Sequence, residues 1–414
     1  MKILVLGGGG REHALCWKLA QSRGVEVFAS PGNPGIAQIG TCLLNPQSYL
    51  TLAEEIAADL TVVGPEAPLV AGVVDEFRAR GKKIIGPDRA AARLEGSKAF
   101  AKHFFRQTRI PTADYLTVDN PEDARRAIAR FGFPVVLKAD GLAAGKGVVI
   151  AHDQAEADAA LATLTGRLVV EEFLRGEEVS FIALCDGRSV VPLAPTQDHK
   201  AVFDGDTGPN TGGMGAYCDS AILTDSQTQY VLDRVIRPTV EATGFTGFLY
   251  AGLMMTDAGP KVLEFNVRLG DPETQPLMKR MASDFVPVLT AAATGELAGV
   301  KLDWHPDPTV CVVLASGGYP GSYSSGKPIH GIADAEATGA TVFHAGTKLD
   351  TFSLVTNGGR VLGVTASGPT LASAIDNAYR GVDKITFEGM HYRTDIGRKG
   401  LVGVYPSRRR GADS

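Results

Sequence analysis

From the first residue to Asp88, the chain alternates short apolar runs with stretches of mixed polarity. β-Branched and other apolar residues fill residues 2–7, 25–29, 60–64 and 82–86. Residues 11–22 and 69–80, between these runs, have apolar positions at the spacing of an amphipathic helix. Apolar strands that alternate with helices predict βαβ units and a parallel sheet, with a ligand at the carboxyl ends of the strands.

Turns rich in glycine and proline follow three of these predicted strands. They are residues 7–10 (GGGG), 30–35 (SPGNPG) and 64–69 (GPEAPL). The first turn does not match the dinucleotide fingerprint G-x-G-x-x-G, because its third glycine position is Glu12 or His13. The acidic residue expected at the end of the second strand is also missing, since that strand runs into Ser30 and Pro31. Two interpretations stay open: an anion at the N-terminus of the first helix, or a βα turn that binds nothing.

The middle of the chain again alternates helices and strands. A helical region at residues 88–107 has Asp88 as its predicted N-cap. The pattern then predicts strands at residues 110–118, 134–140, 167–174, 177–187, 189–197, 248–256 and 261–268, and helices at 121–131, 154–164 and 271–285. Residues 199–217 are rich in glycine and aspartate, and we expect a long irregular loop with a functional role. Residues 321–327 (GSYSSGK) mark a linker into a C-terminal α/β segment.

A glycine–lysine loop (GLAAGKG, residues 141–147) lies between two apolar, β-branched runs. It is not a P-loop, because only three residues separate Gly141 from Gly145. In addition Gly147, and not a serine or threonine, follows Lys146. A loop between two strands predicts a hairpin flap whose backbone N–H groups cover phosphates while its lysine adds charge. An ordinary mobile hairpin is the alternative for this loop taken alone.

Residues 261–268 (KVLEFNVR) alternate apolar and polar side chains, as in a strand with two different faces. One face would carry Glu264, Asn266 and Arg268, and the other Leu263, Phe265 and Val267. A carboxylate and an amide oxygen two residues apart suit Mg²⁺, which completes its shell with phosphates and water. Arg268 can neutralise an anion beside them. The alternative, a solvated polar face, is weakened by the apolar partner strand and by Asp271 and Glu273 downstream.

Two weaker signals lie upstream of this strand. Residues 171–180 (EEFLRGEEVS) predict a strand end, a break and a second strand. Exposed backbone groups at such a break can bind an adenine edge, and a carboxylate that follows can bind ribose hydroxyls. Lys98 and Lys102 lie one helical turn apart, and taken alone they are expected to be solvated.

The chain has 414 residues, of which 44% are hydrophobic and 21% are charged, with a net charge of −5. This length predicts about two to four domains, and the composition is typical of a soluble globular protein. The absence of a basic excess argues against nucleic acid binding, and no apolar run is long enough for a membrane span. Five scattered cysteines without a C-x-x-C pair suggest reduced thiols in the cytoplasm.

Together these features resemble the ATP-grasp ligases, in which a phosphate-binding lysine precedes a strand–glycine loop–strand, an adenine hinge and a metal-binding acid/amide strand. Longer strings resemble the phosphoribosylamine–glycine ligase family over nearly the whole chain. They are GGGGREHAL, SPGNPG, GPEAPLVAG, LEGSKAFAK, LKADGLAAGKGV, EEFLRGEEVSF, DHKAVFDGDTGPNTGGMGAY, EFNVRLGDPETQ and NGGRVLGVTA. The segments DGDTGPNTGGMGAY and GDPETQ are the most specific. One departure is Leu269, where an aromatic residue is usual, and it should affect packing rather than chemistry.

The resemblance implies an α/β multidomain protein with the ATP-grasp fold. Its parts would be an N-terminal Rossmann-like parallel-sheet domain (residues 1–100), an ATP-grasp core or A domain (101–120 and 190–325), a small flap or B domain (121–189) and a C-terminal α/β domain (326–414) with a disordered tail. It also implies ATP and Mg²⁺ or Mn²⁺ as cofactors, and glycine and 5-phosphoribosylamine as substrates. We expect a cytoplasmic monomer or weak homodimer with no nucleic acid or membrane partner.

Site residues carry over by the same resemblance. ATP would contact Lys102, Lys138, Gly141, Gly145, Lys146, Gly147, Glu171, Phe173, Leu174 and Glu178. The metal would bind Glu264 and Asn266, and Lys138, Arg268 and Asp206 would be catalytic. The substrates would contact Gly8, Gly9, Gly10, Asn33, Gly35, Glu66, Asp198, Lys200, Asp206, Asn210, Thr211, Gly212, Gly213, Met214, Arg268 and Asp271.

The implied reaction activates the carboxylate of glycine with the γ-phosphate of ATP, and the amine of phosphoribosylamine then attacks the glycyl phosphate. No cysteine or serine lies in a recognisable nucleophile motif, so no enzyme-bound acyl group is needed. Another ATP-grasp carboxylate–amine ligase or a purine-pathway carboxylase subunit is the alternative, but it should lack the loop DGDTGPNTGGMGAY. A nicotinamide dehydrogenase would need the fingerprint that Glu12 and His13 interrupt. A non-catalytic nucleotide sensor would lack the metal strand.

Overall fold

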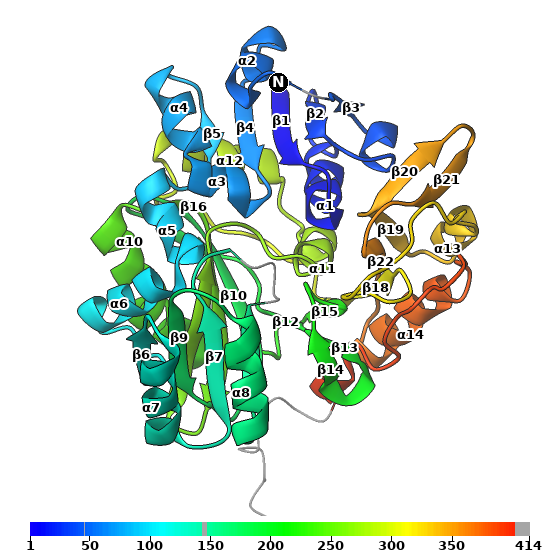
Figure 1. Cartoon of the computed structure of the whole chain (residues 1–414). Helices are drawn as coiled ribbons and strands as arrows, with labels where there is room; N and C mark the ends of the chain where they lie inside the picture. The colour runs from blue at the N-terminus through cyan, green and yellow to red at the C-terminus, as the bar shows by residue number, and fades with distance from the viewer. Residues whose placement is uncertain (45, 143–146, 402–414) are drawn as a thin grey trace, which may run out of the picture.

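The computed structural model describes residues 1–44, 46–142 and 147–401 (Figure 1). Its N-terminal part is a five-stranded parallel sheet of order β3-β2-β1-β4-β5. The elements are β1 (Lys2–Gly7), α1 (Gly10–Leu19), β2 (Glu26–Pro31), β3 (Thr41–Cys42), α2 (Tyr49–Glu55), β4 (Leu60–Val63), α3 (Glu66–Ala71), α4 (Val73–Ala79) and β5 (Ile84–Ile85). The βαβ pattern is confirmed, and α2 and the short β3 are additions to it.

The central strand β1 is buried on both faces because elements pack on both sides of the sheet. Successive residues face different cores: Leu4 packs in one with Phe77 of α4, and Val5 packs in the other with Leu15 of α1. A strand buried on both faces needs a continuous apolar run, which explains why KILVLG does not alternate.

Two predicted helices are broken by a turn residue. Residues 69–80 fall within α3 and α4, because Gly72 between them has a left-handed conformation with φ 98°. Residues 88–107 form α5 (Arg89–Gly96) and α6 (Lys98–Thr108), separated by Ser97. Asp88 caps α5 by accepting a backbone hydrogen bond, as predicted, and the hydroxyl of Ser97 caps α6 in the same way.

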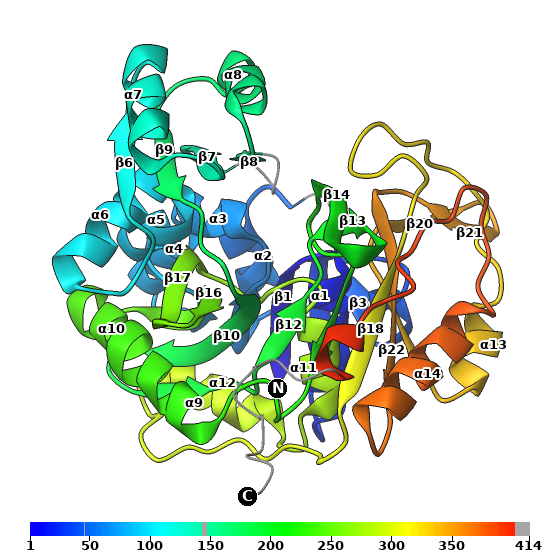
Figure 2. The ribbon, with the colours of Figure 1, turned by 90° about the horizontal axis from the view of Figure 1, so that it is seen from below.

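A four-stranded antiparallel sheet of order β6-β9-β7-β8 has its own core and projects from the rest of the molecule (Figure 2). Its elements are β6 (Tyr115–Val118), α7 (Pro121–Phe131), β7 (Val135–Ala139), β8 (Val148–Ala151), α8 (Gln154–Thr163) and β9 (Leu168–Glu172). β7 and β8 pair antiparallel, with Lys138 opposite Val148, so the predicted hairpin is confirmed. Gly145 and Lys146 lie outside the described residues. The predicted strand 110–118 is shorter, because residues before β6 run beside Val262 instead.

The largest sheet runs from the centre of the molecule into its C-terminal part, in the order β17-β16-β10-β12-β15-β18-β22-β19 with β11 paired to β10. Its strands are β10 (Glu177–Asp186), β11 (Val190–Pro192), β12 (Thr196–Asp198), β15 (Gly215–Cys218), β16 (Thr246–Thr256), β17 (Gly259–Asn266), β18 (Thr309–Ala315), β19 (Thr341–His344) and β22 (Arg360–Ser367). Other elements are α9 (Asp225–Val231), the π-helix η3 (Leu232–Ile236), α10 (Arg237–Thr243), α11 (Thr274–Arg280), α12 (Phe285–Thr294), α13 (Ile332–Ala337), the hairpin of β20 (Thr347–Asp350) and β21 (Ser353–Thr356), α14 (Leu371–Val382) and the 3₁₀ helix η4 (Arg398–Leu401).

The prediction of an irregular loop at residues 199–217 is wrong in part. β13 (Ala201–Phe203) and β14 (Thr207–Asn210) pair as a small hairpin around the 3₁₀ turn η2 (Asp204–Asp206). β15 then enters the large sheet between β12 and β18. Glycine favours this placement, because a side chain at Gly215 would lie 2.7 Å from the carbonyl oxygen of Cys311 on the neighbouring strand.

The predicted alternation in residues 261–268 is wrong for Leu263. β16 and β17 pair Gly252 with Glu264 but Leu253 with Val262, so Leu263 is an extra residue in a β-bulge. Phe265 therefore joins the main core, whereas Leu263 packs in a separate small cluster. A bulge turns one side chain away from the alternating pattern, and here it turns Leu263 toward the cavity described below.

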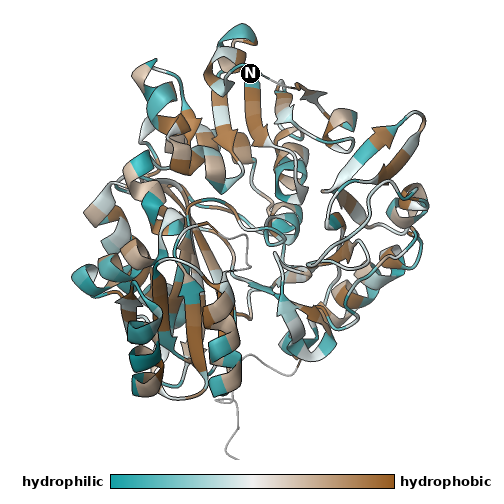
Figure 3. Cartoon of the chain, in the orientation of Figure 1, coloured by the Kyte–Doolittle hydropathy of each residue, from teal (hydrophilic) through white to brown (hydrophobic). Residues whose placement is uncertain are grey.

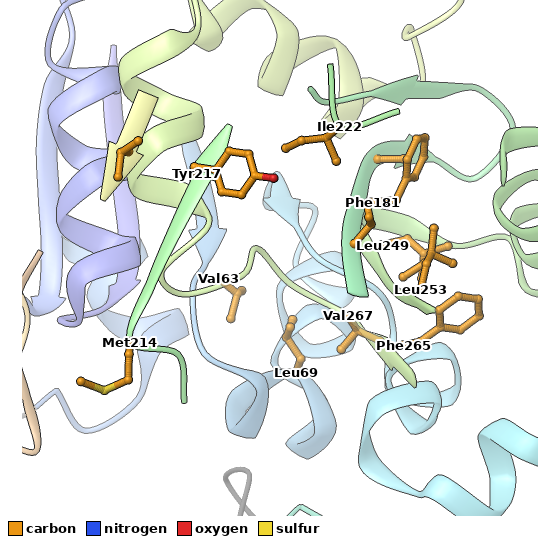
Figure 4. Packing of buried hydrophobic residues seen from close by; sticks show 14 of the residues in the cluster. Val63, Leu69, Phe181, Met214, Tyr217, Ile222, Leu249, Leu253, Phe265 and Val267 are labelled. Carbon is orange, nitrogen blue, oxygen red and sulfur yellow. The ribbon is translucent and has the colours of Figure 1, made fainter. Parts of the chain in front are cut away.

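The largest core joins the N-terminal sheet to the large sheet. Figure 3 shows hydrophobic residues concentrated along the strands and polar residues along helices such as α7. In the close view of Figure 4, Val63 of β4 and Leu69 of α3 belong to the same cluster as Phe265 and Val267. The N-terminal sheet and the large sheet are thus packed through shared apolar contacts. Among the described residues, no helix has the length and apolar character needed to cross a membrane.

Candidate active site

A cavity of about 490 Å³ lies where the N-terminal sheet, the four-stranded sheet and the large sheet meet. It brings together side chains that lie far apart in the sequence. Predicted site residues among its lining are Glu66, Lys102, Lys138, Gly141, Gly147, Glu171, Asp198, Lys200, Asn210, Thr211, Gly212, Glu264, Asn266, Arg268 and Asp271. The lining also includes Arg11, Glu95, Lys98, Tyr250, Glu273, Tyr319 and Arg360, to which the sequence analysis gave no site role.

Two lysines share one carboxylate on the side of the cavity formed by the four-stranded sheet. Lys102 Nζ of α6 lies 2.9 Å from Glu171 Oε2, and Lys138 Nζ of β7 lies 3.1 Å from Glu171 Oε1. The expectation that Lys102 is solvated is wrong, since only 2% of this residue is exposed. Burial lowers the pKa of Lys102 to about 8, although the Glu171 carboxylate acts in the opposite direction. Lys98 lies at the same wall and donates a hydrogen bond to the carbonyl oxygen of Gly141.

A small apolar cluster lies next to these lysines. Leu174, which follows β9, packs with Ala113 and Met254, and Leu263 of the β17 bulge packs against them. Lys138 Nζ donates to the carbonyl oxygen of Leu263, so the cluster and the lysine pair are adjacent. Leu174 is buried and Phe173 is half-buried. The bulge thus supplies an apolar wall beside the charged one, which suits a flat base joined to phosphates.

The two predicted metal ligands lie together on the cavity wall. Burial acts to raise the pKa of Glu264, but Lys200, Lys138, Lys98 and Arg268 outweigh it and hold the pKa below its usual range. Glu264 is therefore a charged carboxylate beside the amide of Asn266, a hard-oxygen pair that fits Mg²⁺ or Mn²⁺. Across residues 1–44, 46–142 and 147–401, no group of three or more His, Cys, Asp or Glu side chains could hold a metal ion. A divalent ion at Glu264 would accordingly need ligands from phosphates and water, as Mg²⁺ usually does.

Lys200 lies between Glu178 of β10 and Glu264 of β17. Its Nζ lies 2.9 Å from Glu178 Oε2 and 3.9 Å from Glu264 Oε1. Burial acts to lower the pKa of Lys200, but Glu178, Asp198 and Glu264 raise it well above its ordinary value. The pKa of Asp198 is also raised, to about 7, mainly by burial and further by Glu273, while Lys200 acts to lower it. Lys200 is therefore a fixed positive charge in the middle of the cavity.

Arg268 is held by carboxylates from two helices. Its Nη2 lies 3.0 Å from Glu95 Oε1, and its Nε lies 3.5 Å from Glu66 Oε2. Glu95 also accepts a hydrogen bond from the backbone N–H of Val267, which fixes the chain beside the arginine. Asn266 accepts a further hydrogen bond from Arg268 Nη2. Sequence reasoning missed Glu95, which lies inside the quoted string LEGSKAFAK, because its partners are 172 residues away.

Arg360 is the second missed residue. It begins β22 and pairs with Asp271, at 3.1 Å between Nη2 and Oδ2. Its guanidinium also donates to the carbonyl oxygens of Gly212 and Asp271, and the hydroxyl of Tyr319 accepts a hydrogen bond from the N–H of Gly212. A charged residue at the start of the apolar run RVLGV was the available signal. Arg360 and Tyr319 thus bring the C-terminal part of the chain to the cavity.

The N-terminal glycine turn lies close to the cavity but does not line it. The N–H of Gly9 donates to Glu12 Oε2 at 2.6 Å, and Glu12 pairs with Arg11. The anion at the N-terminus of α1 is therefore the protein's own carboxylate. A side chain added at Gly9 or Gly10 would approach Asp271, whose carboxylate lines the cavity.

Asn33 and Gly35 lie at the boundary with the C-terminal part. The amide of Asn33 donates to the carbonyl oxygens of Gly8 and His344. Gly35 leaves no room for a side chain, because an added Cβ would lie 2.2 Å from the ring of His13. A Cβ at Gly8 would lie 2.3 Å from the carbonyl oxygen of Gly32. These contacts show why small residues are required in these turns.

The remaining predicted residues lie on the segment between β12 and β15. Asp206 is on the β13–β14 turn and does not line the cavity; it pairs with Arg393 and Lys399. Met214 is fully buried in the main core. Gly213 lies against the ring of Pro272, where a Cβ would come within 2.4 Å. Lys200 near its start and Asn210, Thr211 and Gly212 near its end are the parts of this segment that reach the cavity.

The projecting four-stranded sheet, the buried lysines and the acid/amide strand around one cavity define an ATP-grasp enzyme. Three models of the phosphoribosylglycinamide synthetase family match the chain: the N domain at residues 1–95, the ATP-grasp (A) domain at 96–274 and the C domain at 309–399. The chain belongs to this family, that of the phosphoribosylamine–glycine ligases.

Relatives support this membership along the whole chain. The phosphoribosylamine–glycine ligase of Pseudomonas aeruginosa is 51% identical over 97% of this chain and 99% of its own, and that of Escherichia coli K12 is 50% identical over the same shares. The crystal structure of the Thermotoga maritima phosphoribosylamine–glycine ligase has a TM-score of 0.84 at 36% identity, covering 95% of this chain and 100% of its own. A biotin carboxylase domain of Hydrogenobacter thermophilus 2-oxoglutarate carboxylase has a TM-score of 0.71 at 18% identity, covering 94% of this chain and 91% of its own. That second likeness shows the fold alone.

Proposed function

We propose that the cavity joins glycine to 5-phosphoribosylamine in two steps, with ATP as the energy source and a glycyl phosphate as the intermediate. The overall reaction follows from family membership: the chain is an ATP-dependent ligase that forms glycinamide ribonucleotide in purine biosynthesis. The observation that carries the two-step proposal is the order of groups in the cavity. Buried lysines, an acid/amide pair and the segment of residues 210–212 line one continuous space.

ATP would lie between the four-stranded sheet and the large sheet. Adenine would pack against the cluster of Leu174 and Leu263, with Phe173 and the backbone at Glu171 along its edge. The phosphates would lie against Lys102 and Lys138. Gly141, Gly145, Lys146 and Gly147 would cover the phosphates, and Glu178 would accept hydrogen bonds from the ribose hydroxyls. The shared carboxylate of Glu171 supports this placement, because two lysines against one carboxylate leave a net positive charge for an anion.

The divalent ion that ATP-grasp enzymes use would be held by Glu264 and Asn266, and we propose Mg²⁺ or Mn²⁺ on the chemistry of these oxygens. When bound, it would neutralise charge on the phosphate oxygens. Neighbouring residues hold both metal-binding side chains in a form suited to the ion. Glu264 stays ionised because of the surrounding lysines, and Arg268 holds the side chain of Asn266 by a hydrogen bond to its oxygen.

The substrates would lie on the other side of the metal strand. A carboxylate oxygen of glycine would attack the γ-phosphorus, the bond from this phosphorus to the β–γ bridging oxygen would break, and ADP would leave. Lys138, Lys200 and Arg268 would stabilise the charge spread over the transferred group. Glu66, Asp198, Asp271 and the segment 210–212 would contact the substrates, and the glycine turn at Gly8, Gly9 and Gly10 with Asn33 and Gly35 would lie on the phosphoribosyl side.

In the second step the amine nitrogen of phosphoribosylamine would attack the carbonyl carbon of glycyl phosphate. The carbon–oxygen bond to phosphate would break, and phosphate and one proton would leave with formation of the amide. An acyl phosphate hydrolyses readily, so closure of the β7–β8 flap over the site would protect the intermediate from water. The burial of Lys102 and Lys138 beside the flap supports such a closed site.

The same proposal divides the chain into the N-terminal domain (residues 1–100), the A domain (101–120 and 190–325), the B domain (121–189) and the C-terminal domain (326–414). The separate core of the four-stranded sheet supports the B domain. The boundary at residue 326 has less support, because β18 pairs with both β15 and β22 and the family model of the C domain begins at residue 309. A monomer or weak homodimer and a cytoplasmic location stay predictions.

A coupled assay of ADP release tests the proposed reaction. We expect ADP only when glycine and phosphoribosylamine are both present, together with Mg²⁺, and we expect one amide for each ADP. Steady ADP release with glycine replaced by bicarbonate would contradict the proposal and indicate a carboxylase. Release without any amine would mean that the cavity does not couple the two steps.

A further inference from the structure

The segment between β12 and β15 reaches the cavity only at its two ends. Asp198 and Lys200 line the cavity at one end, and residues 210–212 line it at the other. Between these ends the β13–β14 hairpin turns away, and residues 203–209 are all exposed. Ala201 and Val202 at the start of the hairpin are buried, and the exposed remainder depends on polar contacts for its position.

These polar contacts come from the last described residues of the chain. In Figures 1 and 2 the red C-terminal segment runs beside β13 and β14. Hydrogen bonds join His391 to the carbonyl oxygen of Val202 and the N–H of Thr394 to Asp204 Oδ1. Two further backbone donors belong to the same set: the N–H of Gly205 donates to Asp395 Oδ2, and the N–H of Gly397 donates to His199 Nε2.

Arg393 is the centre of this set. It is fully buried, and its guanidinium has acceptors in both segments. Nη1 donates to the carbonyl oxygen of Ala201 at 3.1 Å and to Asp206 Oδ1 at 2.9 Å. Nε and Nη2 form a bidentate pair with Asp395, each at 2.7 Å. A guanidinium holds such a fork rigidly, so it fixes the start of β13 and the turn at the same time.

Asp206 lies in the turn between β13 and β14. It adopts a left-handed conformation with φ 56°, next to Gly205 at φ 67°. Its second carboxylate oxygen lies 2.6 Å from Lys399 Nζ. Burial acts to raise the pKa of Asp206, but Lys399 and Arg393 outweigh it and hold the carboxyl ionised. Asp206 therefore anchors the turn to the C-terminal segment and does not reach the cavity.

We propose that Arg393, together with Lys399, is a positioning residue of the ligase: through Asp206 and Ala201 it sets the two cavity ends of the β12–β15 segment. Arg360 and Tyr319 hold the same segment at Gly212, so the C-terminal part fixes it at both ends of the hairpin. The proposal rests on the proposed function, because the ends that it sets are those assigned to the substrates. The sequence predicted Asp206 to be a catalytic residue. In this proposal Asp206 instead positions the segment that contacts the substrates, and it does not touch the reacting atoms.

The test uses the full chain with the variants Arg393→Met, Lys399→Met and Asp206→Asn, and Arg380→Met as a control at an exposed arginine of α14. The readouts are the KM for glycine and for phosphoribosylamine, ATP binding by calorimetry, and hydrogen exchange at residues 201–210. Lys399→Met and Asp206→Asn remove half-exposed partners, so they keep the test valid if the buried Arg393→Met variant fails to fold.

We expect the KM of at least one of these two substrates to rise by about tenfold, which corresponds to ~1.4 kcal/mol, with ATP affinity within about twofold of the parent. Hydrogen exchange at residues 201–210 should become faster. Lys399→Arg, unlike Lys399→Met, should have the KM and the exchange rate of the parent. The proposal would be overturned if the KM values did not change. It would also be overturned if ATP affinity fell as much as the KM values rose. A failure of the proposed function looks different, because the parent protein itself would then show no ADP release that depends on glycine and phosphoribosylamine.

Discussion

Glu171 Oε2 lies 2.9 Å from Lys102 Nζ, and the side chains of both residues are almost completely buried. The other carboxylate oxygen of Glu171 lies 3.1 Å from Lys138 Nζ. One carboxylate therefore faces two ammonium groups, and the site has an uncompensated positive charge where we place the phosphates of ATP. This arrangement makes the stability of the protein depend on Glu171, a residue of the proposed nucleotide site.

Replacement of Glu171 by glutamine keeps the shape of the side chain and removes its charge. Two buried lysines would then face each other without a counter-ion, so we expect the free energy of unfolding to fall by about 3 kcal/mol. Urea unfolding measures this, and Glu172→Gln is the control, because Glu172 pairs with Lys261 at a more exposed position. That control should cost less than about 1 kcal/mol. Equal losses in the two variants would contradict the role given to Glu171.

The affinity for ATP should depend on the charge of Lys102. Its pKa is about 8, and bound phosphate favours the ammonium form, so affinity should be constant at low pH and fall as the pH rises through 8. The expected slope approaches tenfold per pH unit. Lys102→Arg should remove the slope, because a guanidinium stays charged. Calorimetric titrations between about pH 6.5 and 9.5 measure the ATP affinity of the parent and of Lys102→Arg. The same dependence of affinity on pH in both proteins would contradict this prediction.

The contribution of Lys102 to protein stability should rise with pH, whereas the ATP affinity should fall. The pKa of Lys102 is about 8 in the folded protein, compared with 10.5 for an ordinary lysine, which is the value in the unfolded chain. Between these values the unfolded chain binds more protons, so the contribution of Lys102 to the free energy of unfolding rises with pH. Unfolding measured across this window in the parent and in Lys102→Arg should show the difference.

Glu264→Gln should lower turnover far more than stability. It removes one charge from the oxygen pair, and Asn266→Leu should act in the same way by removing an oxygen. We expect turnover to fall by about a hundredfold, the scale of one lost charge-assisted contact, and more Mg²⁺ to be needed for half-maximal rate. Glu241→Gln, at an exposed glutamate of α10, is the control. Full activity of either site variant at low Mg²⁺ would show that this strand does not hold the metal.

Gly9→Val should affect phosphoribosylamine and not ATP. Gly9 has φ −86°, which valine can adopt, but its Cβ would lie 2.8 Å from Glu12 Oε2 and 3.7 Å from Asp271 Oδ2. Displacement of the Glu12 carboxylate, beside Asp271, should raise the KM for phosphoribosylamine by roughly a hundredfold, with ATP affinity close to the parent value. Circular dichroism checks that the turn still folds. A folded variant that lost ATP binding and kept its KM for phosphoribosylamine would assign the nucleotide to the N-terminal domain.

Much of the fold could be predicted because local pattern and burial agree. The run KILVLG predicts a strand of a parallel sheet, and the structure has β1 in such a sheet, between two cores. The hairpin of β7 and β8 followed from two apolar runs around a glycine loop. The predictions failed where one residue changes the geometry, as the β-bulge does at Leu263 and the left-handed Gly72 does between α3 and α4.

Several residues of the site could not be predicted from the sequence, because contacts between distant parts of the chain determine their roles. Lys102 reads as a solvated helix residue, and only the approach of β9 buries it beside Glu171. Glu95 and Arg393 act on partners 172 and 187 residues away, so no local spacing reveals them. The position of Glu264 and Asn266 on the cavity wall could be predicted, because both residues lie on one face of the same strand.

Transfer of oxygen from glycine to phosphate tests the central claim most directly. With glycine labelled by ¹⁸O in its carboxylate, a glycyl phosphate intermediate leaves one labelled oxygen in each inorganic phosphate that is released, because the carbon–oxygen bond breaks in the second step. We predict one ¹⁸O per phosphate by mass spectrometry, in parallel with amide formation. Released phosphate without label would contradict the account, because the γ-phosphate would then never have been joined to glycine.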